Sequence, residues 1–461
     1  MYEFETMKKE RIHLSEHFHY RKLIRFVFPS VMMMVFVSVY GIIDGIFVSN
    51  FVGGIPFAAL NLIFPLIMIL GAVGFMLGTG GNAVVSKLLG EGDGKRAKSV
   101  FSMLIYTTAV LGVILGIAGI LIARPVAELF ARSEKNMTPA EKVELVENCV
   151  LYARIILCVL PAFMLQNAFQ GFFVTAEKPR LGLFVTVAAG CCNIVLDALF
   201  VAVFKWGLVG AAVATAISQV VGGVLPVLYF ARKNDSLLRL GKMKMEWKTL
   251  GGVCVNGSSE LMTNVSLSFV TMLYNAQLMR LEGIIGVSAY GIMQYIGFIF
   301  VAVFLGYAVG SAPIIGYHYG AKNDGELKNV FKKSLILTAL LGGVMTAVAI
   351  GLAKPFSWIF ANGDKPLLEM TTHGMRVYSV CYLVCGFNIF SSAFFTALGN
   401  GGVSLLISFF RTFLCQVAAV LVLPIIWGTN GVWAAFAAAE IITLGLTVTL
   451  FIVCRKRYHY I

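Results

Sequence analysis

Two aspartates lie inside stretches of the chain that are otherwise almost wholly apolar. Asp44 lies in "VYGIIDGIFVSN", and Asp197 lies in "NIVLDALF", residues 193 to 200. Asn193 precedes Asp197 by four residues, so in a helix both side chains project from one face, about 6 Å apart along the axis. Ionisable groups inside membrane spans are costly and are functional by default. Two carboxylates with an amide suit a hard cation or a shared proton.

The depth of these groups follows from the short break "FKWG" at residues 204–207, which makes its flanking segments antiparallel neighbours. Asp197 lies about nine residues before the break and Thr215 about nine after it, so both lie ~13 Å from that end. Asp44 lies about eight residues before "FVGG", at a similar depth. We therefore predict a cation site near the bilayer midplane, formed by Asp44, Asn193, Asp197 and Thr215. The alternatives are a static hydrogen-bond network and a role for Asp197 in capping a helix break.

Further polar residues interrupt other apolar runs. Asn167 and Gln170 share a helix face in "FMLQNAFQGFF", where they either bind a ligand or join helices through their amides. Glu260 in "NGSSELMTNVS" either meets a cationic substrate or pairs with a neighbouring amide. Glu440 occupies the position that Gln219 has in an internal repeat, so a packing or hydrogen-bond role fits it as well as a functional one.

Methionines are abundant, with 19 in the chain. Their flexible side chains can repack around varied apolar ligands, although on a lipid-facing helix they are simple filler. The candidates for substrate contact are Met33, Met262 and Met293.

The composition requires an integral membrane protein. Of the 461 residues, 59% are hydrophobic and 13% are charged, with a mean hydropathy of +0.85. Apolar runs exceed the roughly 20 residues that a helix needs to cross a bilayer, and they lack the alternation of barrel strands. No cleaved signal precedes the first run, and the scattered cysteines indicate neither a disulfide framework nor a zinc site. We predict twelve helical spans, near 26–50, 57–86, 99–123, 149–175, 181–203, 207–230, 250–279, 285–317, 331–353, 371–397, 403–425 and 430–454.

The basic residues set the orientation of these spans. With alternate loops on opposite sides, 25 of the 36 Lys and Arg residues fall on the side of the N-terminus and eight on the other. Cytoplasmic loops carry such an excess, so both termini should be cytoplasmic. This distribution explains the net charge of +13 without a nucleic-acid partner. Four other polar residues lie nearer the ends of spans, where their side chains can extend to the polar interface: His318, Arg154, Arg376 and Arg411.

An internal duplication divides the chain. "GGNAVVSKLLGEGDGKRAKSVF" (80–101) aligns with "GSAPIIGYHYGAKNDGELKNVF" (310–331), and "WGLVGAAVATAISQ" (206–219) with "WGTNGVWAAFAAAE" (427–440). Each half has six spans, so the halves share one orientation and are related by a pseudo-twofold axis along the membrane normal, as in secondary transporters. The predicted organisation is a cytoplasmic segment 1–25, a six-helix bundle 26–230, a cytoplasmic linker 231–248, a second bundle 249–454 and a tail 455–461.

No residue pattern indicates an ATPase, because the glycine-rich "GEGDGKRAK" (90–98) lacks the P-loop pattern and recurs as a connector. Energy must then come from an ion gradient or a partner. We expect no enzymatic activity and no cofactor. A membrane enzyme such as a glycosyltransferase would need large catalytic loops, and a channel would not need duplicated bundles.

The chain resembles the multidrug and toxic compound extrusion (MATE) family, in its DinF-like and MepA-like bacterial branch. The residues that carry the resemblance are "YGIIDGIFVSNFVG", "NLIFPL", "GTGGNAVVSKLLGEGD", "NIVLDALF" and "GLVGAAVATAISQ". The resemblance implies a V-shaped pair of bundles around a cavity that exchanges a drug-like substrate for Na⁺ or H⁺. It implies a cation site in the first bundle at the four residues above, with Asn167 as an associate, and a substrate role for Glu260. The carboxylate that the NorM-like branch has in span 10 is absent from residues 378–400.

These observations predict a cation-coupled antiporter for amphipathic, cationic compounds, a monomer in the bacterial inner membrane. The alternative is a lipid-linked oligosaccharide flippase of the same superfamily, which would line its cavity with several basic residues.

Overall fold

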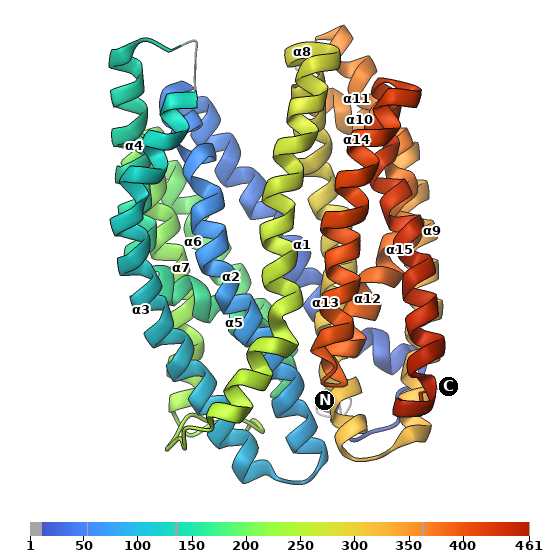
Figure 1. Ribbon diagram of the computed structural model, residues 1–461. Coiled ribbons are helices and arrows are strands. Elements are labelled where there is room, and N and C mark those ends of the chain that lie inside the picture. The colour runs from blue at the N-terminus through green and yellow to red at the C-terminus, as the bar shows by residue number, and fades with distance from the viewer. Residues whose placement is uncertain (1–11, 53, 134–136, 362–363, 461) are drawn as a thin grey trace, which may run out of the picture.

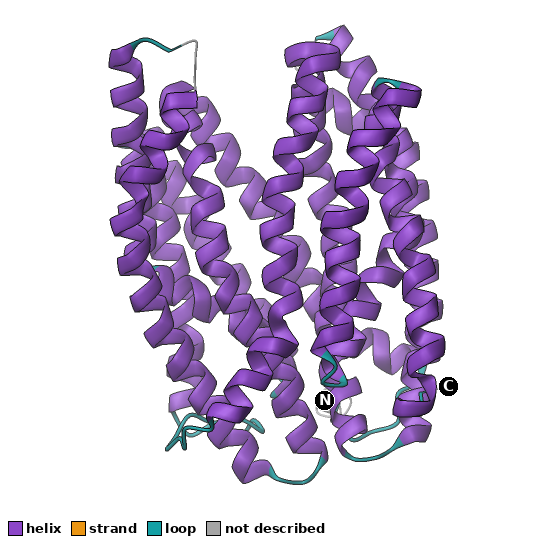
Figure 2. Ribbon diagram, in the orientation of Figure 1, coloured by secondary structure: helices purple, strands orange, loops and turns teal. Residues whose placement is uncertain are grey.

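The computed structural model describes residues 12–52, 54–133, 137–361 and 364–460. Helices form all regular structure in these ranges, which contain no strand (Figures 1 and 2). The helices of the first half are α1 (Tyr20–Phe51), α2 (Gly54–Gly90), α3 (Gly94–Ser133), α4 (Pro139–Cys158), α5 (Leu160–Thr175), α6 (Pro179–Asp197) with the π-helical η1 (Ala198–Val203), and α7 (Gly207–Ala231).

The second half begins with the long helix α8 and follows the same plan. Its elements are α8 (Trp247–Gly320), α9 (Asp324–Gly351), α10 (Ala353–Ala361), α11 (Lys365–Tyr378), the 3₁₀ turn η2 (Ser379–Cys381), α12 (Tyr382–Ala397), α13 (Gly401–Phe409), the π-helical η3 (Phe410–Leu414), α14 (Cys415–Trp427) and α15 (Thr429–Tyr458).

The helices provide the expected number of membrane crossings. Ten helical stretches are each long and apolar enough to cross a membrane, and the pair α4 and α5, bent by 56°, makes an eleventh span. Helix α8 turns back at Gly283, whose φ of 65° is in the left-handed region that favours glycine. The rings of Tyr274 and Tyr290 stack 4.8 Å apart across this turn, so α8 counts as two spans. The described residues thus contain twelve crossings, and the predicted all-helical membrane fold is confirmed.

Some helices extend further than predicted. The charged stretch at 124–148 was expected to be a loop, but α3 continues to Ser133 and α4 begins at Pro139. A capping box explains the early start of α4, since Thr138 accepts from the Glu141 backbone and the Glu141 side chain accepts from the Thr138 backbone. Similarly, α1 begins at Tyr20 rather than near residue 26.

The two halves meet along α2 and α8. A Cβ atom added at Gly257 would overlap the carbonyl of Met76, and one added at Gly80 would overlap the carbonyl of Val253. Glycine therefore lets the two backbones touch directly, as small residues do between membrane helices. In Figure 1 the halves lie together at the lower end, where α1 begins and α15 ends, and diverge toward the upper end. We call the lower end the terminal face.

The segment before α1, residues 12–19, crosses the terminal face and binds both halves. The ring of His13 and the next backbone N–H contact the carboxylate of Glu177 at 2.8 and 2.7 Å. The ring of His17 and the next backbone N–H contact Glu326, at the start of α9, at 2.6 and 2.9 Å. This segment therefore ties the two halves together at the terminal face.

Candidate functional site

Asp197 is the last residue of α6 and lies directly before the π-helical segment η1. The π-helix is rare, appears mostly as a single turn inside an α-helix, and is frequent at functional sites. The side chain is 0% exposed and makes no capping hydrogen bond to η1. The alternative of Asp197 as a helix cap is therefore wrong.

The structure brings four of the predicted residues together. The Asp44 carboxyl group, on α1, interacts with the Asp197 and Asn193 side chains of α6. It also interacts with Thr215 on α7, the helix that packs beside α6. All four side chains therefore lie in one cluster within the first half, as their common depth in the sequence predicts.

Many polar atoms of this cluster have no hydrogen-bond partner among the described residues. They are both carboxylate oxygens of Asp197, both polar side-chain atoms of Asn193, the Thr215 hydroxyl and one oxygen of Asp44. The four groups thus face one another without completing hydrogen-bond geometry. Buried polar groups are nearly always paired, so a finished static network is not what these residues form.

The chemistry of this donor set fits a small hard cation. Carboxylate, amide and hydroxyl oxygens are the ligands that such cations prefer. A proton shared between Asp44 and Asp197 would also relieve the repulsion between two buried carboxylates. The same four side chains can therefore serve either ion.

Three tyrosines surround the cluster, and sequence reasoning missed all three. Tyr40 interacts with Asp44, which follows it by one helical turn on α1. Tyr152 on α4 interacts with both aspartates, and Tyr295 on α8 interacts with Asp44. The four-residue spacing could have identified Tyr40. Tyr295 comes from the second half, so it links the cluster to the other bundle.

A cavity of about 140 Å³ lies between the two halves. Residues from α1, α2, α5, α8, α12, α13 and η3 line it, so both bundles contribute. Its main polar lining residues are Asn82, Asn167, Gln170, Glu260, Thr263 and Arg411. The structure thus places Asn167 in this cavity, together with Gln170 and Glu260. Asn167 is not among the described contacts of Asp44.

Arg411 lies in this cavity at the π-helical segment η3, and its predicted snorkelling to a span end is wrong. Its Nε donates to Glu440 Oε1 at 2.7 Å, and the Glu440 side chain is 0% exposed. The Asn388 amide donates to the other Glu440 oxygen at 2.7 Å and accepts from the Thr447 hydroxyl at 2.9 Å. Glu440 therefore has a polar structural role, as one part of a buried ion-pair network.

The structure also locates His318 and the three methionines that were predicted to contact substrate. His318 is 2% exposed and packs against Phe18, so it does not snorkel either. Met33 is buried beside Gln170 in a small adjoining pocket, and Met262 is half-buried on α8. Met293 lies elsewhere, in the hydrophobic core of the second half.

Comparison with known proteins supports this architecture. The multidrug export protein MepA of Staphylococcus saprophyticus is 23% identical over 457 residues, which cover 97% of both chains. A crystal structure of MATE in complex with MaL6 matches with a TM-score of 0.86 at 23% identity, over 96% of this chain and 97% of that chain. An outward-facing multidrug resistance MATE transporter of the MOP superfamily matches with a TM-score of 0.85, also at 23% identity and with the same coverage.

The family model MatE matches residues 29–199 and 261–422. The two matched segments fall in the two halves, and together they include the Asp44 cluster apart from Thr215 and most of the cavity lining. This match covers well over half of the 461 residues. The chain is therefore a membrane transport protein and belongs to the MatE family.

Proposed function

We propose that the chain is a secondary active transporter that exports amphipathic, cationic organic compounds in exchange for Na⁺ or H⁺. The observation that carries the proposal is the buried cluster around Asp44 and Asp197, whose oxygens lack partners. The name of the MepA relative, a multidrug export protein, supports the same substrate class. We further propose a monomer in the cytoplasmic membrane, with both termini in the cytoplasm.

The mechanism we propose is alternating access between the two halves. The Asp44 and Asp197 pair takes up the cation from outside, and the cation's preference for one state shifts the equilibrium between states. Tyr295 connects this event to the second half, because its side chain interacts with Asp44. The membrane potential adds about 2.3 kcal/mol per charge per 100 mV to cation entry.

The cavity between the halves is the proposed substrate site. Glu260 supplies a carboxylate for a cationic group, and Asn167 and Gln170 supply amides that orient the ligand. Arg411 is the only arginine or lysine in the described lining, and Glu440 already holds it. A lipid pyrophosphate would need several free basic groups, so the cavity favours the antiporter over the flippase.

The test is efflux of a cationic dye from everted vesicles under an imposed Na⁺ or H⁺ gradient. Asp197→Asn should lower gradient-driven efflux at least tenfold, because the amide cannot carry the charge that the cation balances. Glu91→Gln, at an exposed carboxylate of the terminal face, is the matched control and should transport normally.

Two outcomes would overturn the proposal. Efflux that persists in Asp197→Asn with unchanged cation dependence would remove the cluster from the coupling step. Movement of a lipid-linked oligosaccharide without movement of any cationic dye would support the flippase. Dye binding to purified Asp197→Asn separates a coupling defect from loss of the fold.

A further inference from the structure

Helices α1 and α6 both place arginines at the start of their membrane spans, at the terminal face. A groove of about 620 Å³ lies between these helices. It is lined by Arg21, Ile24, Arg25, Phe28, Pro29 and Arg180. The groove is outside the transport cavity and shares no lining residue with it.

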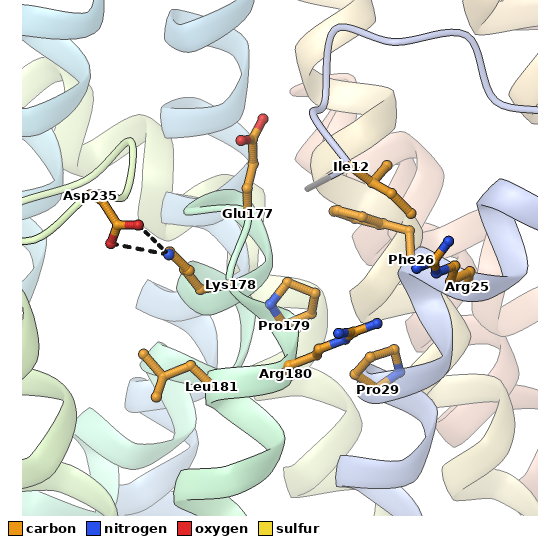
Figure 3. A pocket seen from close by; sticks show the side chains of 10 residues that line it. All are labelled: Ile12, Arg25, Phe26, Pro29, Glu177, Lys178, Pro179, Arg180, Leu181 and Asp235. Atoms are coloured by element: carbon orange, nitrogen blue, oxygen red, sulfur yellow. Dashed lines mark hydrogen bonds and ion pairs between the residues drawn. The ribbon is translucent and has the colours of Figure 1, made fainter. Parts of the chain in front are cut away.

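A second pocket of about 320 Å³ adjoins this groove and shares Arg25, Pro29 and Arg180 with it. In Figure 3 the Arg180 side chain extends from α6 toward Pro29 and Arg25 of α1. Arg21 and Arg25 are one turn apart on the same face of α1. Guanidinium groups from two helices therefore border one hollow.

Among the residues that the structure describes, no carboxylate is paired with the arginines of the groove. Three carboxylates lie in the adjoining pockets, but each already has a basic partner: Glu16 has Lys22, Glu177 has His13 and Asp235 has Lys178. Arg21, Arg25 and Arg180 form no ion pair or hydrogen bond with any residue that the structure describes, and all three are exposed. Within the described part of the chain, three arginines thus lack an anionic partner.

Apolar side chains continue both walls toward the membrane interior. Residues 21, 24, 25 and 28 follow the spacing of one helix face, and Phe28 on that face is 56% exposed. On α6, Phe184 follows Arg180 by four residues and is 67% exposed. At 1.5 Å per residue, each phenylalanine lies about 4–6 Å deeper than the arginine before it. The order from charged to apolar matches that of a lipid headgroup and its acyl chains.

We infer that this groove is a binding site for one anionic phospholipid. The guanidinium groups of Arg21, Arg25 and Arg180 hold its phosphate, since arginine binds phosphate oxygens in a bidentate manner. The acyl chains lie along Phe28 and Phe184. The excess of basic residues at the terminal face assigns this end to the cytoplasmic leaflet, whose lipids are anionic and bind basic pockets between helices.

The test is native mass spectrometry of the purified full chain with dioleoyl phosphatidylglycerol or dioleoyl phosphatidylcholine. The wild type should retain one phosphatidylglycerol in preference to phosphatidylcholine. The variant Arg21→Gln/Arg25→Gln/Arg180→Gln should bind it about a hundredfold more weakly, at about fivefold for each arginine near an anionic headgroup. The matched control is Lys242→Gln/Arg455→Gln/Lys456→Gln, which removes three exposed charges of the terminal face and should bind as the wild type does.

Three results would overturn the inference. They are equal retention of the two lipids, equal loss in the triple variant and its control, and displacement of the lipid by free glycerol 1-phosphate at comparable concentration. The last result would identify a soluble phosphate compound as the ligand. If the triple variant does not fold, the single variants Arg25→Gln and Arg180→Gln decide, each with an expected loss of about fivefold.

Discussion

Replacing Arg411 by leucine should destabilise the second half by about 3–5 kcal/mol, the typical cost of removing one partner of a buried ion pair. The cost arises at Glu440, whose side chain is 0% exposed. The change removes the 2.7 Å contact from the Arg411 guanidinium. Among the described residues, the Glu440 carboxylate then keeps one hydrogen bond, from Asn388 Nδ2 at 2.7 Å. A buried carboxylate with one amide partner carries an unbalanced charge in a medium of low dielectric constant.

A second substitution isolates the charge from the packing. Glu440→Gln in the Arg411→Leu background removes the unbalanced charge, and the new amide oxygen still accepts the hydrogen bond from Asn388. The double variant should therefore recover most of the loss and lie within about 1–2 kcal/mol of the wild type, the usual cost of changes to neutral hydrogen bonds. The double variant should thus be about 2–3 kcal/mol more stable than Arg411→Leu alone.

The assay is thermal unfolding of the purified protein in detergent. At an unfolding entropy of about 2.1 cal/mol/K per residue, a chain of 461 residues has about 1 kcal/mol/K. Arg411→Leu should thus lower the melting temperature by roughly 3–5 °C, and the double variant by about 1–2 °C. Arg376→Leu, at an exposed arginine of the same half, is the control and should change it little. A melting temperature of Arg411→Leu that equals the control, or a double variant no more stable than the single, would refute the reasoning.

Other contacts give further expectations. Gly257→Ala should separate α2 from α8 and reduce efflux at least fivefold. Gly252→Ala on the same helix, where a Cβ atom has open space, should leave efflux unchanged. Equal effects of the two substitutions would show that the contact between α2 and α8 has no role in transport. Tyr295→Phe should weaken the effect of the second half on Asp44 and raise the cation concentration for half-maximal efflux about threefold or more, and an unchanged value would contradict the link. The Arg96 guanidinium lowers the pKa of the linker residue Glu246 through hydrogen bonds at 2.8 and 3.3 Å. Glu246→Gln should speed trypsin cleavage of the linker at pH 7.5 severalfold, and an unchanged cleavage rate would show that the Arg96 contact does not hold the linker.

The cation cluster could be predicted from the sequence because simple helix geometry determines its parts. The spacing of Asn193 and Asp197 places both on one face, and the short break at 204–207 places Thr215 at the same depth. These arguments need only the rise of a helix and the position of one turn. The same count along α1 was sufficient for Asp44.

The arginine network could not be predicted in this way. Arg411 and Glu440 lie on different spans, 29 residues apart, and their meeting depends on how α13, η3 and α15 are rotated about their axes. Distance from a span end suggested only that Arg411 could reach the interface. Tyr295 was missed for a related reason, since its electrostatic interaction with Asp44 depends on how the two halves pack. Local spacing in a sequence does not contain that information.

Comparison of the repeated halves accounts for the placement of the proposed cation site in the first half. Glu440 corresponds to Gln219. A third pair of segments also aligns, "FFVTAEKPRLGL" (172–183) with "FFTALGNGGVSL" (394–405), and extending this alignment backwards pairs Asn388 with Gln166. In the second half these positions hold a carboxylate and an amide. The guanidinium group of Arg411 supplies the positive charge that balances the carboxylate.

In the first half the equivalent positions are neutral amides, and the Gln219 oxygen has no partner among the described residues. The carboxylates lie instead at Asp44 and Asp197, and neither forms an ion pair with any arginine or lysine that the structure describes. Two buried carboxylates cannot both remain charged at low cost unless a positive charge joins them. The second half carries that charge in its own sequence. In the proposed mechanism the first half takes the charge from solution, and this difference would let a cation gradient act on one half of a duplicated protein.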